Sequence, residues 1–283
     1  MVVAACGGGG GAPAAAVPET TAGAAVTGNA VKGPVSGATI RAFGLAGGLQ
    51  GPQVGSAVTD AQGAFAMQLG AHAGPLLLQM TGGSYIDEAS GATVTLAPGE
   101  MMTAVLSSLP PGTTATVQVT PLTAMAQAMA ARMPGGMTPP NIDAANAAIG
   151  NYFMVGDVLH TRPINPLATG SAVGASPAMI NYGMALAGMS QYASSAGVPS
   201  SGFVGAMMLD AADGVLDGRA GTTAITIGPG MMGGAMMQSG AGGAGLATAM
   251  GAFMHSAGNR SGADPAAMTQ LMQQLATQGG RIR

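Results

Sequence analysis

Methionine thioethers and a nearby imidazole are the side chains in this sequence that could bind a soft metal ion. Among 23 methionines, four lie in a glycine-rich stretch with a histidine further along the chain: Met231, Met232, Met236, Met237 and His255. Thioethers suit Cu(I). Methionine is also a flexible filler of apolar cores, and most of the others fall at helical core positions, whereas the glycine-rich 231–237 segment is expected to stay out of the core. We therefore expect no metal and no cofactor, with an extracytoplasmic copper-binding protein as the alternative.

Three aspartates, Asp210, Asp213 and Asp217, are close enough in sequence to be considered as calcium ligands. An EF-hand loop needs oxygen ligands at alternate positions and a final glutamate, and this spacing supplies neither. Gly214 and Gly218 are typical of a helix end and the turn after it. The sequence therefore predicts a solvated helix end, with Asp210 and Asp213 on one face if both are helical.

Gly228 to Gly233 match the G-x-G-x-x-G pattern and follow a strand-like segment. A dinucleotide site also needs a helix immediately afterwards and an acidic residue about 20 positions on. The next acid is Asp264, and so many glycines begin a helix poorly. In a chain with 49 glycines the pattern arises by chance, so we expect no nucleotide site.

Asp157 and His160 are spaced to pair across one helical turn, but no nucleophile is identifiable beside them. The sequence also lacks the H-E-x-x-H and G-x-S-x-G motifs of hydrolases. We expect His160 to contact the end of a helix near Pro163. No catalytic residue is assigned, and an enzyme of unknown type is a further alternative.

Charged residues are scarce, at 7% of the chain, and the formal net charge is −3. A typical soluble domain has about 25%. A nucleic-acid partner would require a basic patch, and this composition offers none. No run of about 20 strongly apolar residues predicts a membrane span.

The chain's one cysteine, Cys6, follows Val3, Ala4 and Ala5 and precedes a run of glycines. This segment resembles the lipobox of bacterial lipoproteins, in which the cysteine becomes the lipidated N-terminus. The resemblance implies an acylated Cys6 and a flexible glycine-rich tether. The basic start and apolar core of a signal peptide are missing, so we expect an upstream start codon or a trimmed chain. The alternative is a disordered N-terminus with an incidental cysteine.

Short alternating or apolar segments separated by turns predict about seven strands between Ala24 and Val119. The segment from Leu76 to Met80 is apolar except for Gln79, as expected of a strand buried on both faces. The other predicted strands are 38–43, 54–59, 64–69, 93–96, 104–106 and 114–119. Their regular spacing, without a helical period, favours a β-sandwich.

Gly28, the segment from Gly33 to Ile40 and the segment from Thr59 to Phe65 resemble the carboxypeptidase regulatory-like group of Ig-like and transthyretin-like modules. The Gly-Pro and Asp-x-x-Gly units make turns, and Phe65 supplies an apolar anchor. Such modules carry no catalytic residues and serve as spacers, adhesins or sugar-binding units.

After Val119 the apolar residues change to a helical period. Thr120, Ser176 and Asp264 each precede a proline, a typical helix start. Asn141 is predicted to cap another helix, and a shorter one is expected from Ser201 to Ala211. The predicted core positions of the four longer helices are Leu122, Met125, Met129, Met133, Ile142, Ala145, Ile149, Tyr152, Met179, Tyr182, Leu186, Met189, Met268, Leu271, Met272 and Leu275.

The predicted fold is α+β with two modules: an N-terminal Ig-like or transthyretin-like β-sandwich and a C-terminal irregular helical domain. The expected divisions are a tether at 1–23, the sandwich at 24–119 and the helical domain at 120–283, with a Gly/Met-rich loop at about 228–245. Together these features resemble bacterial surface lipoproteins with an uncharacterised helical region, in which the stretch from Asp210 to Gly218 recurs.

We expect a non-catalytic, lipid-anchored envelope protein that acts as a binding, adhesion or spacer module. The expected partners are the membrane, through the lipid, and a cell-surface polysaccharide or protein. Gly7 after the cysteine, rather than an aspartate that would resemble an inner-membrane retention signal, favours the outer membrane or cell surface of a Gram-negative bacterium.

Overall fold

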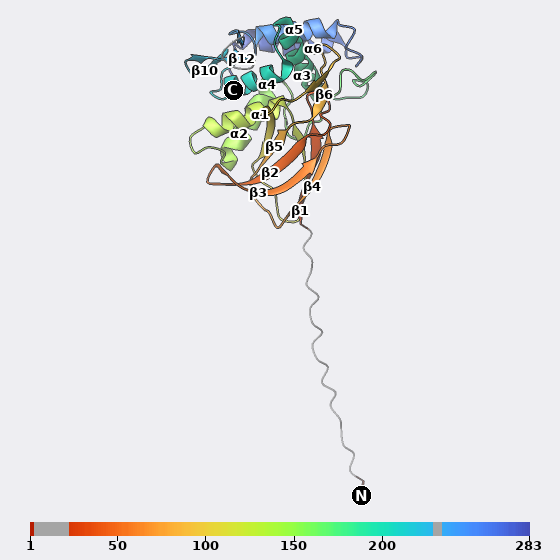
Figure 1. Ribbon diagram of the computed structural model, residues 1–283. Helices are drawn as coiled ribbons and strands as arrows, with labels where there is room; N and C mark the ends of the chain where they lie inside the picture. Colours follow the sequence, from red (N-terminus) through yellow and green to blue (C-terminus); the bar gives the residue numbers. More distant parts are fainter. Residues whose placement is uncertain (3–22, 229–233) are drawn as a thin grey trace.

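The computed structural model describes residues 1–2, 23–228 and 234–283, and its fold is α+β (Figure 1). Strands occupy the first part of the described chain and helices most of the second. Cys6, Met231 and Met232 lie outside the described residues, as does most of the segment from Gly228 to Gly233.

The first nine strands form two larger sheets and a hairpin. Their bounds are β1 Ala24–Ala30, β2 Thr39–Ala46, β3 Leu49–Val58, β4 Ala64–Gly70, β5 Leu76–Thr81, β6 Ser84–Ile86, β7 Thr93–Thr95, β8 Met101–Leu106 and β9 Thr114–Val119. One sheet has the order β4-β1-β9, in which β1 pairs parallel with β9, and the other has the antiparallel order β3-β2-β5-β8. The hairpin is β6-β7.

The two larger sheets share an apolar core. Val26 and Phe65 from the first sheet cluster with Ile40 and Leu78 from the second. Each is at most 5% exposed, and burying such a side chain contributes roughly 1.5–3 kcal/mol. The anchoring role predicted for Phe65 is confirmed by this packing.

Gly28 has no room for a side chain. An added Cβ would lie 1.7 Å from the carbonyl oxygen of Val117 on β9 and 3.1 Å from the ring of Phe65. The glycine therefore lets the two neighbouring strands and the aromatic ring approach closely. In the predicted turn after β3, Asp60 Oδ1 accepts hydrogen bonds from the backbone N–H groups of Gln62 and Ala64, both at 2.8 Å.

The other face of the β3-β2-β5-β8 sheet is covered by helices. Leu77 and Val105 point away from the core between the sheets and join the helical core with Leu122 and Met125. The prediction that the Leu76–Met80 segment is buried on both faces is confirmed. Strand residues thus complete the helical core. The division of the chain into two domains at Thr120 therefore stays a prediction.

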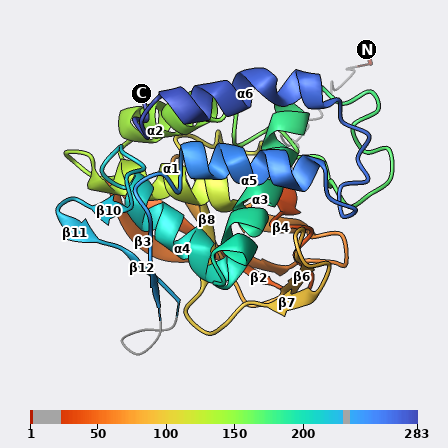
Figure 2. The same ribbon diagram turned by 90° about the horizontal axis from the view of Figure 1, so that it is seen from above.

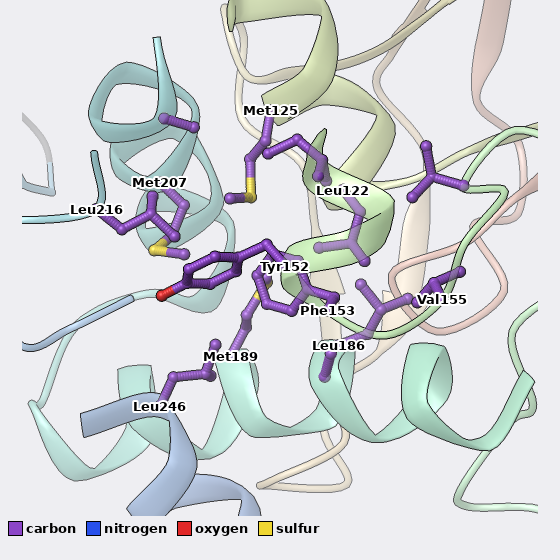
Figure 3. Packing of buried hydrophobic residues seen from close by; sticks show 14 of the residues in the cluster. Leu122, Met125, Tyr152, Phe153, Val155, Leu186, Met189, Met207, Leu216 and Leu246 are labelled. Atoms are coloured by element: carbon purple, nitrogen blue, oxygen red, sulfur yellow. The ribbon is translucent and has the colours of Figure 1, made fainter. Parts of the chain in front are cut away.

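Six helices lie within the described residues. They are α1 Pro121–Arg132, α2 Pro139–Tyr152, α3 Pro177–Ser195, α4 Ser200–Ala211, α5 Ala244–Met254 and α6 Pro265–Thr277. Figure 3 shows how side chains from α1 to α5 pack together, with Tyr152 and Phe153 at the centre. Figure 2 shows α5 and α6 side by side on the outer surface, and α5 packs against α3. None of these helices is both long and apolar enough to cross a membrane.

Three predicted helix starts are confirmed. Thr120, Ser176 and Asp264 are N-caps whose side chains accept backbone N–H bonds, and each is followed by proline. The predicted cap at Asn141 is wrong, because α2 begins two residues earlier, after Thr138. The Asn141 amide instead donates to two carbonyl oxygens of the preceding turn.

The Gly/Met-rich loop predicted at about 228–245 contains regular structure. β12 Thr226–Ile227 pairs with β13 Ala235–Met236, just after a smaller hairpin of β10 Arg219–Ala220 and β11 Thr223–Ala224. Helix α5 begins at Ala244 with a glycine as its N-cap and no side-chain cap bond, so the usual sequence signal for a helix start is missing.

Candidate functional site

The candidate metal ligands in the described part of the chain do not share a common orientation. Met236 is 60% exposed and Met237 5% exposed, as expected for neighbours on opposite sides of a strand end. The expectation that this segment stays out of the core is therefore wrong for Met237, which joins the helical core. His255 Nδ1 lies 2.8 Å from the carbonyl oxygen of Gly251, on its own helix.

The predicted solvated helix end at Asp210 is wrong for this residue, which is fully buried in the last turn of α4. Its Oδ1 atom accepts backbone N–H bonds from Asp217, Gly218 and Arg219 at 2.9–3.1 Å. Asp213 is exposed and follows the helix, so the two aspartates do not share a helical face. No group of three or more His, Cys, Asp or Glu in the described ranges could hold a metal ion.

Asp157 and His160 do pair, with 2.7 Å between Oδ2 and Nδ1, but they lie in a turn between α2 and α3 rather than at a helix end. Both side chains are more than half exposed. Asp157 Oδ1 also accepts the backbone N–H groups of Leu159 and His160. The pair therefore stabilises a surface turn.

A groove bordered by β8, α1 and α4 has a volume of about 590 Å³. Its walls are mainly apolar and include Leu96, Met101, Met102, Val204, Met208 and Leu209. Ligand-binding pockets are typically about 300–1,000 Å³, with apolar walls and a few polar groups. This groove has those properties.

Helix α4 supplies one wall of the groove along its whole length. The lining residues recur every three or four positions: Ser201, Gly202, Val204, Gly205, Met208, Leu209 and Ala212. That spacing places them on one face. At 1.5 Å per residue, the wall from Ser201 to Ala212 is about 17 Å long.

The polar residues Lys32, Tyr85, Glu100 and Ser201 line the groove near the start of α4. Ser201 donates to Glu100 Oε1 at 2.8 Å, and the Tyr85 hydroxyl lies 2.7 Å from Ser200 Oγ. Arg132 lies at the end of α1, where Met129 approaches Gly214 beyond the end of α4. Arg132 therefore marks the opposite end of the groove.

Behind the polar end lies a buried charged cluster. Lys32, 1% exposed, donates to Glu88 Oε2 at 2.9 Å and to the carbonyl oxygen of Leu186 at 3.3 Å. Lys32 also donates to Ser190 Oγ on α3, and the Ser190 hydroxyl lies within hydrogen-bond distance of both Asp87 and Glu88. This network joins the turn after β1, the segment after β6 and α3.

Both burial and the neighbouring charges shift the pKa values of groups in this cluster. It strongly raises the pKa of the Tyr85 hydroxyl, and the carboxylates of Glu88, Asp87 and Glu100 raise it further. For Asp87, burial works to raise the pKa, but the Ser200 hydroxyl, the Ser90 N–H and the Lys32 charge outweigh it. Its pKa is therefore held below the usual value.

Ser190 and Lys32 have the residue types of a Ser–Lys nucleophile–base pair, but their surroundings oppose that chemistry. A lysine base must be uncharged to accept a proton, whereas Lys32 forms an ion pair with Glu88. The single Ser190 proton is directed to a carboxylate, and Ser190 is only 1% exposed. The cluster is arranged to fasten the strands to α3.

Sequence reasoning did not identify the groove or the cluster. The available signal was the rarity of charge: in a chain with 7% charged residues, the adjacent Asp87 and Glu88 follow directly after an aromatic–aliphatic pair. A charged residue in an apolar context is often buried and paired.

No known family and no curated protein matches this sequence. A solved structure of a 9R-lipoxygenase from Cyanothece PCC8801 is similar over 38% of this chain and 18% of that enzyme, with 16% identity and a TM-score of 0.21. The chain thus spans under a fifth of that enzyme. A similarity this weak carries no argument about fold or activity.

Proposed function

We propose that this chain is a non-catalytic binding protein of the cell envelope that is anchored by a lipid on Cys6 and takes an apolar ligand in the groove between α1 and α4. The observation that carries the binding role is the groove itself, with its apolar walls and its polar groups at one end. The hydroxyl and carboxyl groups behind it are engaged with one another, which supports binding rather than catalysis.

The proposal includes a fold assignment for each module. Residues 24–119 are an Ig-like or transthyretin-like sandwich, and residues 120–283 are the helical module. The core shared by the β4-β1-β9 and β3-β2-β5-β8 sheets supports the first assignment. The sandwich would act as a spacer or as a contact surface for a cell-surface polysaccharide or protein, and the groove would lie where it meets the helices.

Gly205 gives a direct test of the groove. It lies in the middle of α4 and lines the cavity, and a Cβ added there would meet nothing within 4 Å. Gly205→Leu should therefore fill part of the groove without a clash. It should also raise helix stability, because glycine costs about 1 kcal/mol in a helix interior.

The binding test uses the neutral apolar dye N-phenyl-1-naphthylamine, whose fluorescence increases in apolar surroundings. The chain contains no tryptophan, so background emission is low. We expect saturable binding to the unmodified protein and at least tenfold weaker binding to Gly205→Leu. Ser194→Leu, which adds the same side chain at an exposed position of α3, is the matched control. Equal binding to all three proteins would refute the groove as the site.

The anchor is tested separately. The native gene expressed in a Gram-negative host should give a membrane-fraction protein with acyl chains on Cys6, detectable by mass spectrometry of the N-terminal peptide. Cys6→Ser should release the protein from the membrane fraction. An unmodified N-terminal peptide with a free thiol would contradict the lipid anchor and leave the groove proposal standing.

A further inference from the structure

The charged residues of the groove are distributed unevenly between its ends. Lys32 and Glu100 line the end at the start of α4, and Asp87 and Glu88 lie directly behind Lys32. One cation and three carboxylates give this end a formal net charge of −2. Arg132 lines the other end, and the α4 wall between the two ends, from Ser201 to Ala212, is about 17 Å long.

Glu100 is the carboxylate of this group that a ligand can reach. Asp87 and Glu88 are 4% and 2% exposed, whereas Glu100 is partly exposed and lines the groove. Its two oxygens accept one hydrogen bond each, from Ser201 and from the Ala97 N–H. A carboxylate has about four lone-pair sites, so Glu100 can accept a further donor.

Lys32 does not neutralise Glu100. Its ammonium is directed to Glu88, Ser190 and the Leu186 carbonyl oxygen, which use its three donors. The negative charge at the groove's polar end therefore has no cation of its own within the lining. Arg132 lies at the other end of the groove.

From this charge arrangement we infer that the groove selects amphiphiles with a protonated amine, whose ammonium group meets Glu100 while the apolar chain lies along α4. This inference rests on the proposed binding role of the groove and names the ligand class. A carboxylate of the same shape would meet a net negative end and bind more weakly. A neutral alcohol would gain the apolar contacts and could donate a hydrogen bond to Glu100, but without the attraction between opposite charges.

The test compares decylamine, decanol and decanoate as competitors for the bound dye at pH 7. Decylamine is a cation at this pH, because alkyl amines titrate near the lysine value of about 10.4, and decanoate is an anion. We expect decylamine to bind about fivefold more tightly than decanol, as a partly exposed ion pair supplies up to ~1 kcal/mol. Decanoate should be the weakest of the three.

Glu100→Gln should bring decylamine and decanol within twofold of each other. Asp143→Asn, which changes the net charge equally on the exposed face of α2, should leave the preference intact. The preference in the unmodified protein should also fall between 0.05 M and 0.5 M salt. This last readout does not depend on how Glu100→Gln folds.

The outcomes separate the two proposals. Equal displacement of the dye by all three compounds, or strongest displacement by decanoate, would overturn the amine preference. The groove would still stand as a binding site if dye binding is lost in Gly205→Leu. An amine preference that persists in Glu100→Gln and is unaffected by salt would also overturn it. Dye binding that ignores Gly205→Leu would refute the binding role itself.

Discussion

Two buried carboxylate sites in this protein are stabilised in different ways. Where the strands meet α3, Glu88 lies 2.9 Å from the Lys32 ammonium and accepts a hydrogen bond from Ser190. At the end of α4, Asp210 is surrounded by backbone: its Oδ1 accepts three N–H groups, and its Oδ2 is buried without a partner among the described residues. One site contains a cation, and the other relies on amide dipoles.

The difference between the two sites appears in the pKa values of two aspartates, Asp87 beside Lys32 and Asp210 at the end of α4. Burial favours the neutral form of each. Around Asp87 the hydroxyl and amide donors and the Lys32 charge overcome that effect and lower the pKa. Around Asp210 the three amide donors do not overcome it, and the pKa is raised from 3.8 to about 6. Amide donors hold a buried carboxyl group in place but do not suffice to offset the effect of burial, so the pKa of Asp210 stays above its usual value.

Removing the cation should have the largest effect. Lys32→Met keeps an unbranched apolar side chain but leaves Glu88 and Asp87 in a buried site without positive charge. We expect the free energy of unfolding to fall by about 3–5 kcal/mol, as when one partner of a buried ion pair is removed. Urea denaturation with an unchanged m value would measure the loss.

A second substitution distinguishes charge from packing in that result. Lys32→Met combined with Glu88→Gln removes the unpaired charge and keeps a hydrogen-bonding group beside Ser190. We expect the double variant to recover at least 1 kcal/mol of the loss. If it is no more stable than Lys32→Met, the cluster acts through packing and not through its charges.

The second largest effect should come from removing the acceptor in the other site. Asp210→Ala leaves the N–H groups of residues 217–219 without their acceptor, and we expect a loss of about 3 kcal/mol at pH 5. Asp210→Asn retains one oxygen for those donors and should lose clearly less. Equal losses in the two variants would show that the N–H bonds contribute little. Chemical denaturation at pH 5 measures both.

Features predicted from the sequence are those with a local cause. The starts of α1, α3 and α6 depend on a cap residue followed by proline, all within four residues. The burial of Leu76, Leu77, Leu78 and Met80 follows from an apolar run that only Gln79 interrupts. The start of α5 was missed because it follows a glycine-rich stretch and has no side-chain cap.

The groove and the charged cluster have no local cause. Lys32 and Glu88 are 56 positions apart, and Lys32 and Ser190 are 158 apart. Their meeting depends on how the helices dock on the strands. The same holds for Asp210, whose local sequence is typical of a helix end but which becomes buried when the residues after α4 fold back over it.

A third effect, intermediate in size, is the dependence of stability on pH, which should differ between the two buried sites. The folded-state pKa of Asp210 is about 6, above its unfolded value of about 3.8, so folding favours its protonated form. Stability from this group is present below about pH 4 and decreases as the pH rises toward 6 and beyond. Asp87 has a lowered pKa, so its contribution is present above its unfolded value and is lost as the pH falls.

We expect the unmodified protein to lose about 2 kcal/mol between pH 4 and pH 7 through Asp210. In Asp210→Asn the free energy of unfolding should no longer fall between pH 4 and pH 7. The variant should still lose stability on acidification below pH 4, a loss to which Asp87 contributes. Urea midpoints measured at pH 3, 4, 5, 6 and 7 for both proteins would show the difference. Parallel profiles for the two proteins would contradict the raised pKa of Asp210.

The smallest effect should come from the ion pair that is not buried. Asp157 and His160 are 58% and 55% exposed, and water screens their interaction. His160→Gln should therefore change the free energy of unfolding by less than about 0.5 kcal/mol at pH 6. Asp157→Ala should cost about 1 kcal/mol, because Oδ1 also accepts the N–H groups of Leu159 and His160 in the turn. Thermal melts of the two variants would give this order. If His160→Gln lost as much free energy of unfolding as Lys32→Met, burial would not determine how much an ion pair contributes to stability in this protein. The difference between the two buried sites would then need another explanation.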